Sequence, residues 1–377
     1  MSAFTSSRYS AGAKWIHTNC SAPLENHFIN VVDGVVDSVT AKPAQRTVFD
    51  FGSECQILPG TVNAHTHLEL SGLPAPLDVP AVAGLRSMAA WIPPLMQFRR
   101  SELYNAENAV AAAFLRQEVL SESVAVADIV PLTLNIQNVP APKIPVWLPF
   151  GELIAWKKEQ VKEKMTEASR CRLTGVSPHA PQTVCPELLE AVIQRNVPVA
   201  MHLAESPEEL ELLQTGGGGA LFGVMKNADP DYEPKNVLLG KRPLDYLQLL
   251  AHSPQAFIIH GNYLDDEELR FLAAHRETLS VVYCPRSHHY FGFQKYPLKK
   301  MLDFGVRVLL GTDSLASSPD LSIVNEMRFT LREHPEIPVE TVFRFGTLDA
   351  AAAFGLNDRF GTIQAGRPAR FAFLTGR

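Results

Sequence analysis

The 377-residue sequence has few cysteines and no pairing pattern among them. Its five cysteines are scattered, odd in number and never in C-X-X-C spacing: Cys20, Cys55, Cys171, Cys185 and Cys284. This distribution argues against a disulfide framework and against a zinc site built from thiolates. Cys284 ends an apolar run and has no evident activating partner, so we expect it to be a small buried hydrophobe rather than a nucleophile.

The sequence also lacks an excess of basic residues. Its 34 Lys and Arg are outnumbered by 40 Asp and Glu, which gives a formal net charge of −6. A nucleic-acid partner would require a basic footprint, so we expect none. No uninterrupted apolar stretch reaches the length that spans a membrane, and the N-terminus has no apolar core of a secretory signal. We therefore expect a cytoplasmic protein without a membrane partner.

Short apolar runs alternate with amphipathic segments along most of the chain. The runs are rich in Val, Ile and Leu, a pattern typical of parallel strands that are buried on both faces. We predict strands at 57–64, 123–130, 144–149, 172–178, 198–203, 256–260, 279–284 and 306–311. Helices are expected between them at 102–120, 186–194, 207–214 and 265–275. Eight strands alternating with helices predict an α/β fold, a (β/α)8 barrel of the TIM type.

The two ends of the chain have a different pattern. Residues 8–56 alternate polar and apolar positions, and residues 361–377 have the same character. We expect both ends to form antiparallel strands of one small β-sandwich. The predicted division is a composite β-sandwich at 1–56 and 358–377 and a (β/α)8 barrel at 57–357. The run Gly216–Gly219 lies between the fifth and sixth strands and is either a flexible linker or the hinge of a lid.

Polar side chains follow five of the predicted strands, at the point where each strand ends. In a barrel, the carboxyl ends of the strands form the active-site face. A single histidine in such a place is more often a structural residue, but five strand ends on one side together indicate a site. The residues are His65 and His67 after the first strand, His179 after the fourth, His202 and Glu205 after the fifth, His260 after the sixth and Asp313 after the eighth.

The chemistry of these groups is coherent. Three neutral imidazoles and one carboxylate suit one divalent cation, zinc or iron, which makes bound water acidic enough to act as a nucleophile near neutral pH. Asp313 is placed to orient the water and accept a proton, and Glu205 to carry a proton to the substrate. His260 can assist deprotonation or polarise the substrate. The alternative for Glu205 is a solvated residue that opens the helix at 207–214.

Four motifs resemble the amidohydrolase superfamily, in its branch of aminohydrolases and chlorohydrolases that includes guanine, cytosine and S-adenosylhomocysteine deaminases. They are Pro-Gly-Thr-Val-Asn-Ala-His-Thr-His-Leu (59–68), Ser-Pro-His-Ala-Pro (177–181), His-Leu-Ala-Glu (202–205) and Leu-Gly-Thr-Asp-Ser-Leu-Ala-Ser (310–317). Dinuclear relatives have a carboxylated lysine where this chain has Ser177-Pro178-His179, so the resemblance implies one metal ion.

The resemblance also implies a role for each residue of these motifs. It gives the metal ligands as His65, His67, His202 and Asp313. Glu205 resembles the proton shuttle of the family and His260 its catalytic histidine. His179 resembles a histidine that contacts the substrate, and Ser317 a serine of the loop that follows the aspartate.

Within that branch, His-Thr-His-Leu-Glu-Leu-Ser (65–71), Trp91 and Arg99-Arg100 resemble the aminodeoxyfutalosine deaminases. Deaminases of S-adenosylhomocysteine tend to have a ribose-binding glutamate about where Arg100 stands. The resemblance implies hydrolytic deamination of an adenosine-like small molecule with release of ammonia. The alternatives are a triazine chlorohydrolase, a guanine or cytosine deaminase, or a non-catalytic metal-binding relative. A homo-oligomer is compatible with all of them.

Five further residues are candidates for substrate binding or for simpler structural roles. Trp91 can stack on a planar ring or anchor its helix in the core. Arg86, Arg99 and Arg100 can grip a substrate carboxylate, since a guanidinium matches that geometry, or they can be solvated surface residues. His288 stands where relatives commonly have asparagine, and it lies either in a binding loop or in an exposed polar turn.

Overall fold

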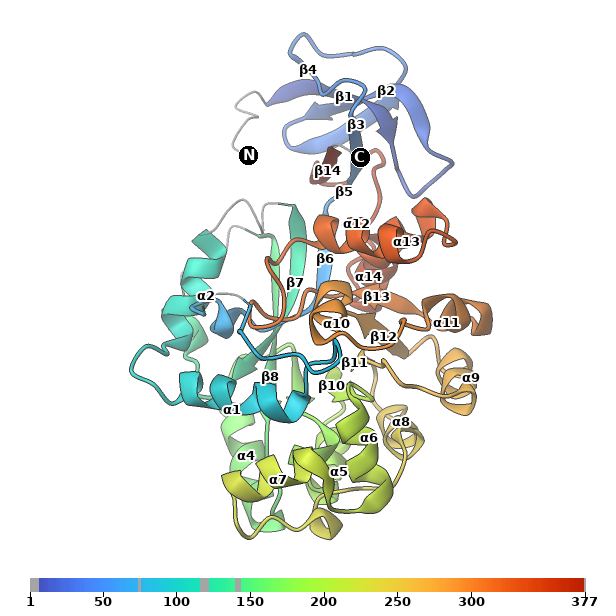
Figure 1. Ribbon diagram of the computed structural model, residues 1–377. Helices are drawn as coiled ribbons and strands as arrows, with labels where there is room; N and C mark the ends of the chain where they lie inside the picture. The colour runs from blue at the N-terminus through green and yellow to red at the C-terminus, as the bar shows by residue number, and fades with distance from the viewer. Residues whose placement is uncertain (1–6, 74–75, 116–121, 140–143, 376–377) are drawn as a thin grey trace.

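The computed structural model describes residues 7–73, 76–115, 122–139 and 144–375. A small β-sheet lies at one end and a barrel ringed by helices fills the rest of the molecule (Figure 1). The barrel strands are β6 (Thr61–Thr66), β7 (Ser123–Pro131), β8 (Val146–Leu153), β9 (Gly175–Pro178), β10 (Val199–Leu203), β11 (Ala256–His260), β12 (Leu279–Tyr283) and β13 (Val308–Leu310).

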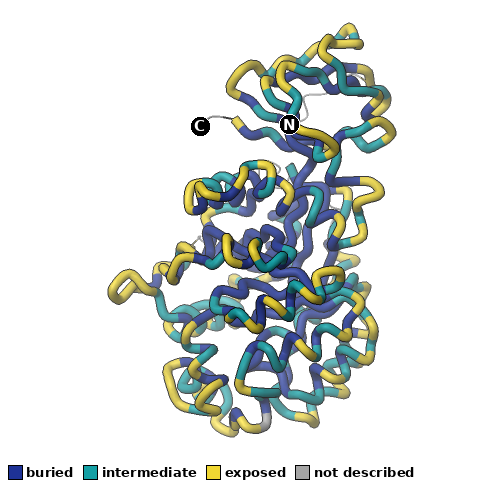
Figure 2. Tube along the Cα trace, turned by 90° about the vertical axis from the view of Figure 1, so that its right-hand side faces the viewer, coloured by how far each residue is buried: buried dark blue, intermediate teal, exposed yellow. Residues whose placement is uncertain are grey.

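These eight strands stand side by side in chain order, and every neighbouring pair is parallel. A parallel bridge between Thr66 and Asp313 brings the last strand back to the first and closes the barrel. The strands are buried almost throughout, as their apolar sequences require. The buried part of the chain accordingly runs through the centre of the barrel (Figure 2). The predicted (β/α)8 barrel is confirmed.

Most predicted helices have counterparts. The segments 186–194, 207–214 and 265–275 correspond to α5, α6 and α9, and the part of 102–120 that the structure describes contains α2, whereas 116–120 lie outside the described residues. The helices are α1 (Met88–Arg99), α2 (Ala106–Leu115), α4 (Lys158–Arg170), α5 (Pro186–Gln194), α6 (Pro207–Thr215), α7 (Gly219–Ala228), α8 (Pro243–Leu250), α9 (Asp266–Ala274), α10 (Pro285–Phe291), α11 (Leu298–Phe304), α12 (Ile323–Glu333), α13 (Val339–Phe345) and α14 (Leu348–Ala353).

The two ends of the chain combine into one six-stranded sheet, so the predicted pairing of the ends is confirmed. The prediction that these strands are all antiparallel is wrong, because β1 pairs in parallel with both β4 and β5. Its order is β14-β5-β1-β2-β3, and β4 pairs with β1. An apolar core of its own, which includes Ile29, Ile57 and Phe371, holds the sheet together. Its strands are β1 (Arg8–Ile16), β2 (Leu24–Val32), β3 (Val35–Thr40), β4 (Val48–Asp50), β5 (Cys55–Pro59) and β14 (Phe371–Thr375).

The prediction of one strand at 57–64 is wrong. The chain forms β5 in the terminal sheet and then β6 in the barrel, with Gly60 between them. The backbone N–H of Gly60 donates to Arg370 O at 2.9 Å, and a Cβ at this position would lie 2.4 Å from the side chain of Val124. Glycine therefore lets one continuous apolar run cross from one sheet to the next without a loop. The predicted boundary between residues 56 and 57 falls inside β5.

Two helices lie where the sequence suggested loops. The segment that begins at the last of the four glycines forms α7, in which Leu221 and Met225 are buried one turn apart. The glycines join α6 to α7, and all four have positive φ, beginning with Gly216, which ends α6 in a left-handed conformation. His288 and His289 belong to α10 rather than to a polar turn. No helix among the described residues is long and apolar enough to cross a membrane.

Candidate functional site

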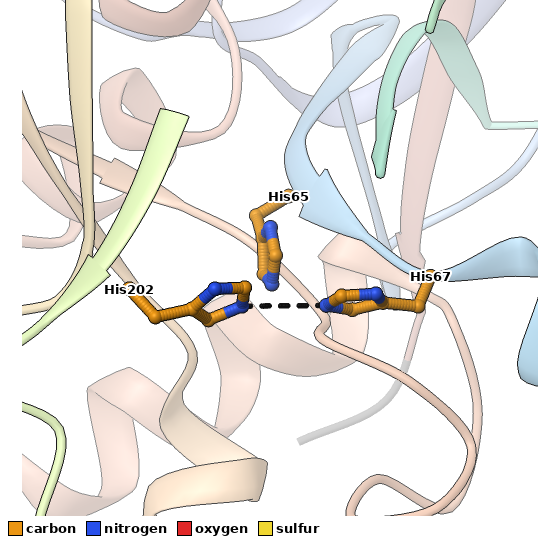
Figure 3. A group of neighbouring side chains, drawn as sticks. All are labelled: His65, His67 and His202. Atoms are coloured by element: carbon orange, nitrogen blue, oxygen red, sulfur yellow. Dashed lines mark hydrogen bonds between the residues drawn. The ribbon is translucent and has the colours of Figure 1, made fainter. Parts of the chain in front are cut away.

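Three histidines meet at the carboxyl ends of two barrel strands. His65 lies in β6 and His67 directly follows its last residue, and His202 comes from β10 across the barrel. Their rings point toward one another, and one ligand nitrogen from each lies within 4.8 Å of the other two (Figure 3). All three side chains are buried. We refer to His65, His67 and His202 as the histidine cluster.

The geometry of the cluster fits a single cation. Nε2 of His67 lies 3.3 Å from Nε2 of His202. Ligand atoms that share one tetrahedral zinc ion at about 2.0–2.1 Å are about 3.3 Å apart. Asp313 Oδ1 lies 3.7 Å from Nε2 of His65 and 4.0 Å from Nε2 of His67, so the carboxylate faces the same point. Nε2 of His65, which faces Asp313, is buried and has no hydrogen-bond partner among the described residues, as expected of an atom that would bind a metal ion.

Burial disfavours the charged form of two of the imidazoles, and a hydrogen bond orients one of them. Burial lowers the pKa of His67 to about 3 and, together with the neighbouring His179, lowers the pKa of His202 well below its usual range. Nδ1 of His202 lies 2.9 Å from the backbone oxygen of His179. Because a carbonyl only accepts, Nδ1 carries the hydrogen and Nε2 presents its lone pair to the cluster.

Asp313 is held on its other oxygen by two serines. Ser287 Oγ donates to Asp313 Oδ2 at 2.7 Å, and Ser317 Oγ donates to the same atom at 2.9 Å. Burial acts to raise the pKa of this carboxyl, but the nearby rings of His65 and His260 outweigh it and hold the pKa well below its usual range. The structure thus places Ser317 behind the aspartate, and Ser287 has the same role although the sequence did not single it out.

Glu205 lies next to His260, a histidine of the site that is outside the histidine cluster. Its Oε1 lies 3.2 Å from Nε2 of His260, and both side chains are largely buried. Helix α6 begins after Ser206, which caps it, so Glu205 precedes the helix and does not open it as a solvated residue. Burial, and next the charge of Asp313, raise the pKa of Glu205 well above its usual range. This environment favours the protonated form of the carboxyl group, the form that can donate a proton.

A cavity of about 390 Å³ opens onto these groups. It reaches the histidines, Glu205 and Asp313 at one end, and its walls are mainly apolar. His179 lies in the wall, with Nδ1 2.9 Å from Thr183 Oγ1. The other apolar or aromatic residues of the wall are Leu70, Met88, Trp91, Ile92, Leu95, Met96, Ile154, Trp156, Met225 and Ala228.

Trp91 combines the two roles that the sequence left open. Its ring lies in the wall of the cavity, and it packs edge to face on Phe291 with ring centroids 5.6 Å apart. Its indole N–H donates to the backbone oxygen of Ala316 at 3.4 Å. The tryptophan therefore anchors α1 beside the strand-end loops while one side of it remains available to a ligand.

The three candidate arginines have different surroundings. Arg86 donates to the backbone oxygens of Val79 and Tyr290 and is not among the residues that line the cavity. Arg99 lines the cavity, but its guanidinium is bound to two carboxylates, with Nε 3.1 Å from Glu69 Oε1 and Nη1 3.3 Å from Glu152 Oε2. Arg100 is exposed and lines the cavity. Only Arg100 therefore reaches the cavity with its charge uncommitted among the described residues.

Arg99 is expected to be essential for stability. Both carboxylates that it pairs with are buried, Glu69 completely, so Arg99→Met would leave two like charges without a cation. Breaking a buried pair in this way costs about 3–5 kcal/mol of unfolding free energy. Urea denaturation measures the loss. The neighbouring Arg100→Met is the matched control and should change stability by less than about 0.5 kcal/mol. Equal stability of the two variants would contradict the ion-pair account.

The structure does not bring His288 to the cavity. Its ring is buried among the aromatic rings of Tyr283, Phe293 and Tyr296, and burial lowers its pKa to about 4. His289, next to it, is exposed. Cys284 is buried, and burial raises the pKa of its thiol well above the usual range, as expected of a small hydrophobe.

Three acidic residues at the site escaped the sequence reasoning. Glu152 ends β8 and lines the cavity, Glu209 lines it from the first turn of α6, and Glu69 is buried behind His67. The sequence contains only weak indications that these glutamates belong to the site. Glu152 lies beyond the predicted end of its strand at residue 149, because the observed strand continues to Leu153. Glu209 has the spacing of an ordinary helix-capping residue.

The closed barrel with histidines and an aspartate at its strand ends defines the architecture of a metal-dependent hydrolase. The sequence model of the Amidohydrolase family matches residues 152–376, and the chain belongs to that family. The family depends on a metal ion, and the histidine cluster is the histidine-rich site that the structure provides. As a member of this family, the chain is a hydrolase that acts on C–N bonds.

Individual relatives extend the comparison. The 5-methylthioadenosine/S-adenosylhomocysteine deaminase of Pyrococcus furiosus is 29% identical over 378 residues, which cover 92% of this chain and 81% of that protein. The structure of Helicobacter pylori aminofutalosine deaminase in complex with methylthio-coformycin has a TM-score of 0.78 at 21% identity and covers 98% of this chain and 92% of its own. A zinc-bound adenosine deaminase from Xanthomonas campestris has a TM-score of 0.67 at 20% identity, with 97% and 84% covered.

Proposed function

We propose that this chain is a mononuclear metal-dependent deaminase of an aminopurine-type, adenosine-like substrate. The observation that carries the proposal is the position of Glu205 and Asp313, which lie beside the histidine cluster at the inner end of one apolar cavity. The names of the relative from Pyrococcus furiosus and of the Helicobacter pylori structure support the adenosine-like class. Water replaces the amino group of the substrate, so one C–O bond forms, one C–N bond breaks and ammonia leaves.

The metal ligands in this proposal are the histidine cluster and Asp313. Zinc is the proposed metal and iron the alternative, since neutral imidazoles and a carboxylate suit both. When bound, the cation polarises water and lowers its pKa toward neutrality. Elemental analysis of protein purified without chelators should find about one zinc or iron ion per chain. Two metal ions per chain, or none, would contradict the proposal.

The residues of the chain handle the protons. Asp313 is ionised and held by its two serines, so it can accept a proton from the attacking water. Glu205 is protonated and delivers its proton to the ring nitrogen next to the amino-bearing carbon. His260 Nε2 lies 3.2 Å from the Glu205 carboxyl, where His260 can assist deprotonation or polarise the substrate. Among the residues of the cavity wall, His179 and Trp91 are proposed to contact the substrate, and the Trp91 ring is available for stacking on a planar base.

An ammonia-release assay with metal-loaded protein tests the function. The panel contains adenosine, 5′-methylthioadenosine, S-adenosylhomocysteine and aminodeoxyfutalosine, together with guanine, cytosine and a chlorotriazine. We expect ammonia from at least one adenosine-like compound. Turnover of aminodeoxyfutalosine alone would identify the subfamily. Ammonia from guanine or cytosine alone, or chloride from the triazine alone, would overturn the proposed substrate class.

Arg100 is expected to select substrates by charge. Arg100 lines the apolar cavity and has no carboxylate partner among the described residues, so we propose that its guanidinium binds a carboxylate on the 5′ arm of a substrate. Such a charged contact is worth about 1.5–3 kcal/mol. Arg100→Met should therefore lower kcat/KM about 10- to 100-fold for aminodeoxyfutalosine and S-adenosylhomocysteine, and less than about 3-fold for 5′-methylthioadenosine. Arg170→Met, on the far helix α4, is the control. An equal change for all substrates would contradict the prediction.

Three other predictions concern the whole protein. The division of the chain into a terminal unit and a barrel unit, the cytoplasmic location and a homo-oligomeric assembly stay predictions. Light scattering after size-exclusion chromatography measures the assembly directly.

A further inference from the structure

The carboxylate of Glu209 accepts hydrogen bonds from two consecutive backbone N–H groups, those of Ala204 and Glu205. Oε1 accepts from the N–H of Ala204 at 2.7 Å, and Oε2 accepts from the N–H of Glu205 at 3.0 Å. Glu209 is 2% exposed and stands in the first turn of α6, at the wall of the cavity. One buried side chain thus holds two consecutive backbone N–H groups next to the proposed proton donor.

This arrangement differs from ordinary helix capping. At the start of α9, Glu268 Oε2 accepts from the N–H of the capping residue Asp265 at 2.8 Å, and Asp265 Oδ1 accepts from the N–H of Glu268 at 3.0 Å. In α6, Ser206 Oγ accepts from the N–H of Glu209 at 3.1 Å, which is half of the same motif. The carboxylate of Glu209, however, reaches past Ser206 to the two preceding residues. It therefore serves the strand-end segment rather than the helix terminus.

The segment that Glu209 holds needs such support. Ala204 has a φ of 53°, a left-handed conformation that an alanine adopts at a cost of about 1–2 kcal/mol. On the other side of the segment, Asn262 Nδ2 donates to the backbone oxygen of Glu205 at 2.8 Å. Both the N–H and the C=O of Glu205 are thereby fixed by side chains. The result is a carboxyl group 3.2 Å from His260 Nε2 at the inner end of the cavity.

We propose that Glu209 is the positioning residue of Glu205 and that Asn262 completes the clamp from the opposite side. The inference rests on the proposed function, in which Glu205 carries the proton. Proton transfer requires the donor within hydrogen-bond distance of its target. A displacement of about 1 Å at a reacting group can cost about 100-fold in rate. The clamp acts on catalysis through the backbone of Glu205 and does not touch the substrate's reacting atoms.

Glu209→Gln is the first test. The variant has nearly the same shape, but its NH2 group faces a backbone N–H, so one of the two hydrogen bonds is lost and a repulsive contact replaces it. We expect kcat to fall about 100-fold while KM changes less than about 3-fold and metal content is unchanged. Glu268→Gln is the matched control, since it alters a buried glutamate at the same position of another helix that also accepts from backbone N–H groups. It should cost similar stability and leave kcat unchanged.

A double-mutant cycle separates positioning from general destabilisation. In the Glu205→Gln background there is no proton donor to place, so adding Glu209→Gln should change kcat less than about 3-fold. Asn262→Ala breaks the other arm of the clamp and should lower kcat about 10-fold. In the Glu205→Gln background it should have little further effect. This second variant keeps the test available if Glu209→Gln folds poorly. Native kcat in Glu209→Gln together with low kcat in Glu205→Gln would overturn this inference but not the proposed function. A double variant whose loss of kcat equals the product of the two single losses would have the same consequence. Native kcat in Glu205→Gln would overturn the proposed function itself.

Discussion

Exhaustive chelation, or replacement of His202 by alanine, is expected to lower deaminase activity by about 1,000-fold or more. The cation polarises water and stabilises developing charge by several kcal/mol, and each 1.36 kcal/mol corresponds to a factor of ten in rate. His202 supplies one of the cluster's inward-facing nitrogens, so its loss removes a ligand that no other described residue replaces. Activity assays and elemental analysis on the same preparation measure both effects.

Removal of the metal ion should also lower the thermal stability of the protein, which can be measured without an activity assay. A ligand that binds only the folded state at about 1,000 times its Kd stabilises it by about 4.1 kcal/mol. For a chain of this length, that loss corresponds to a fall in Tm of about 5 °C. Addition of zinc to the chelated protein should restore the Tm of the unaltered chain but not that of His202→Ala. His252→Ala, at an exposed position, is the control and should retain metal, Tm and activity. Full activity and unchanged Tm at negligible metal content would refute the metal site.

Glu205→Gln is expected to lower kcat by about 1,000-fold and leave the metal in place. Glutamine preserves the size of the side chain but has no acidic proton to deliver, and proton transfer by a positioned group contributes about 100- to 10,000-fold. Glu205 is not among the ligands of the histidine cluster, so metal content and KM should change little. Steady-state kinetics on the most active substrate of the panel, with metal analysis in parallel, distinguish this outcome from loss of the site.

The surface residue Glu211, on the helix α6 that follows Glu205, provides the control. Glu211→Gln removes an identical charge from an exposed position and should have native kcat. A Glu205→Gln variant that retains more than about half of the native kcat would show that another group donates the proton. Loss of metal in that variant would instead assign Glu205 to the metal site and contradict its role as a separate proton donor.

The inner end of the site was predictable because it depends on strand ends. His65, His67, His202 and Asp313 each follow an apolar run, and parallel strands of one barrel all end on the same face. The alternation of apolar runs and helical segments predicts eight parallel strands. The barrel that such strands form then places the residues at their carboxyl ends close together. Local pattern was sufficient because the barrel repeats one simple unit.

The outer part of the site was not predictable in this way. Arg86, Arg99 and Arg100 have the same chemistry in the sequence, yet one binds loop carbonyls, one neutralises two buried glutamates and one reaches the cavity. The partners of Arg99 lie thirty or more positions away in the sequence, and one partner of Arg86, Tyr290, lies more than two hundred positions away. His288 was misjudged for the same reason, since its burial depends on aromatic side chains from neighbouring segments.

The sequence by itself determined the barrel, the pairing of the two chain ends and the residues at the strand ends, because hydrophobic alternation and strand direction are local properties. Only the tertiary structure decided where the apolar run at Gly60 divides between two sheets, which serines hold Asp313 and which glutamate holds the backbone of Glu205. The local pattern of polar and apolar residues does not indicate which of these groups will meet. Their partners are fixed only when the packed helices and loops bring hydrogen-bond donors and acceptors within about 3 Å of one another.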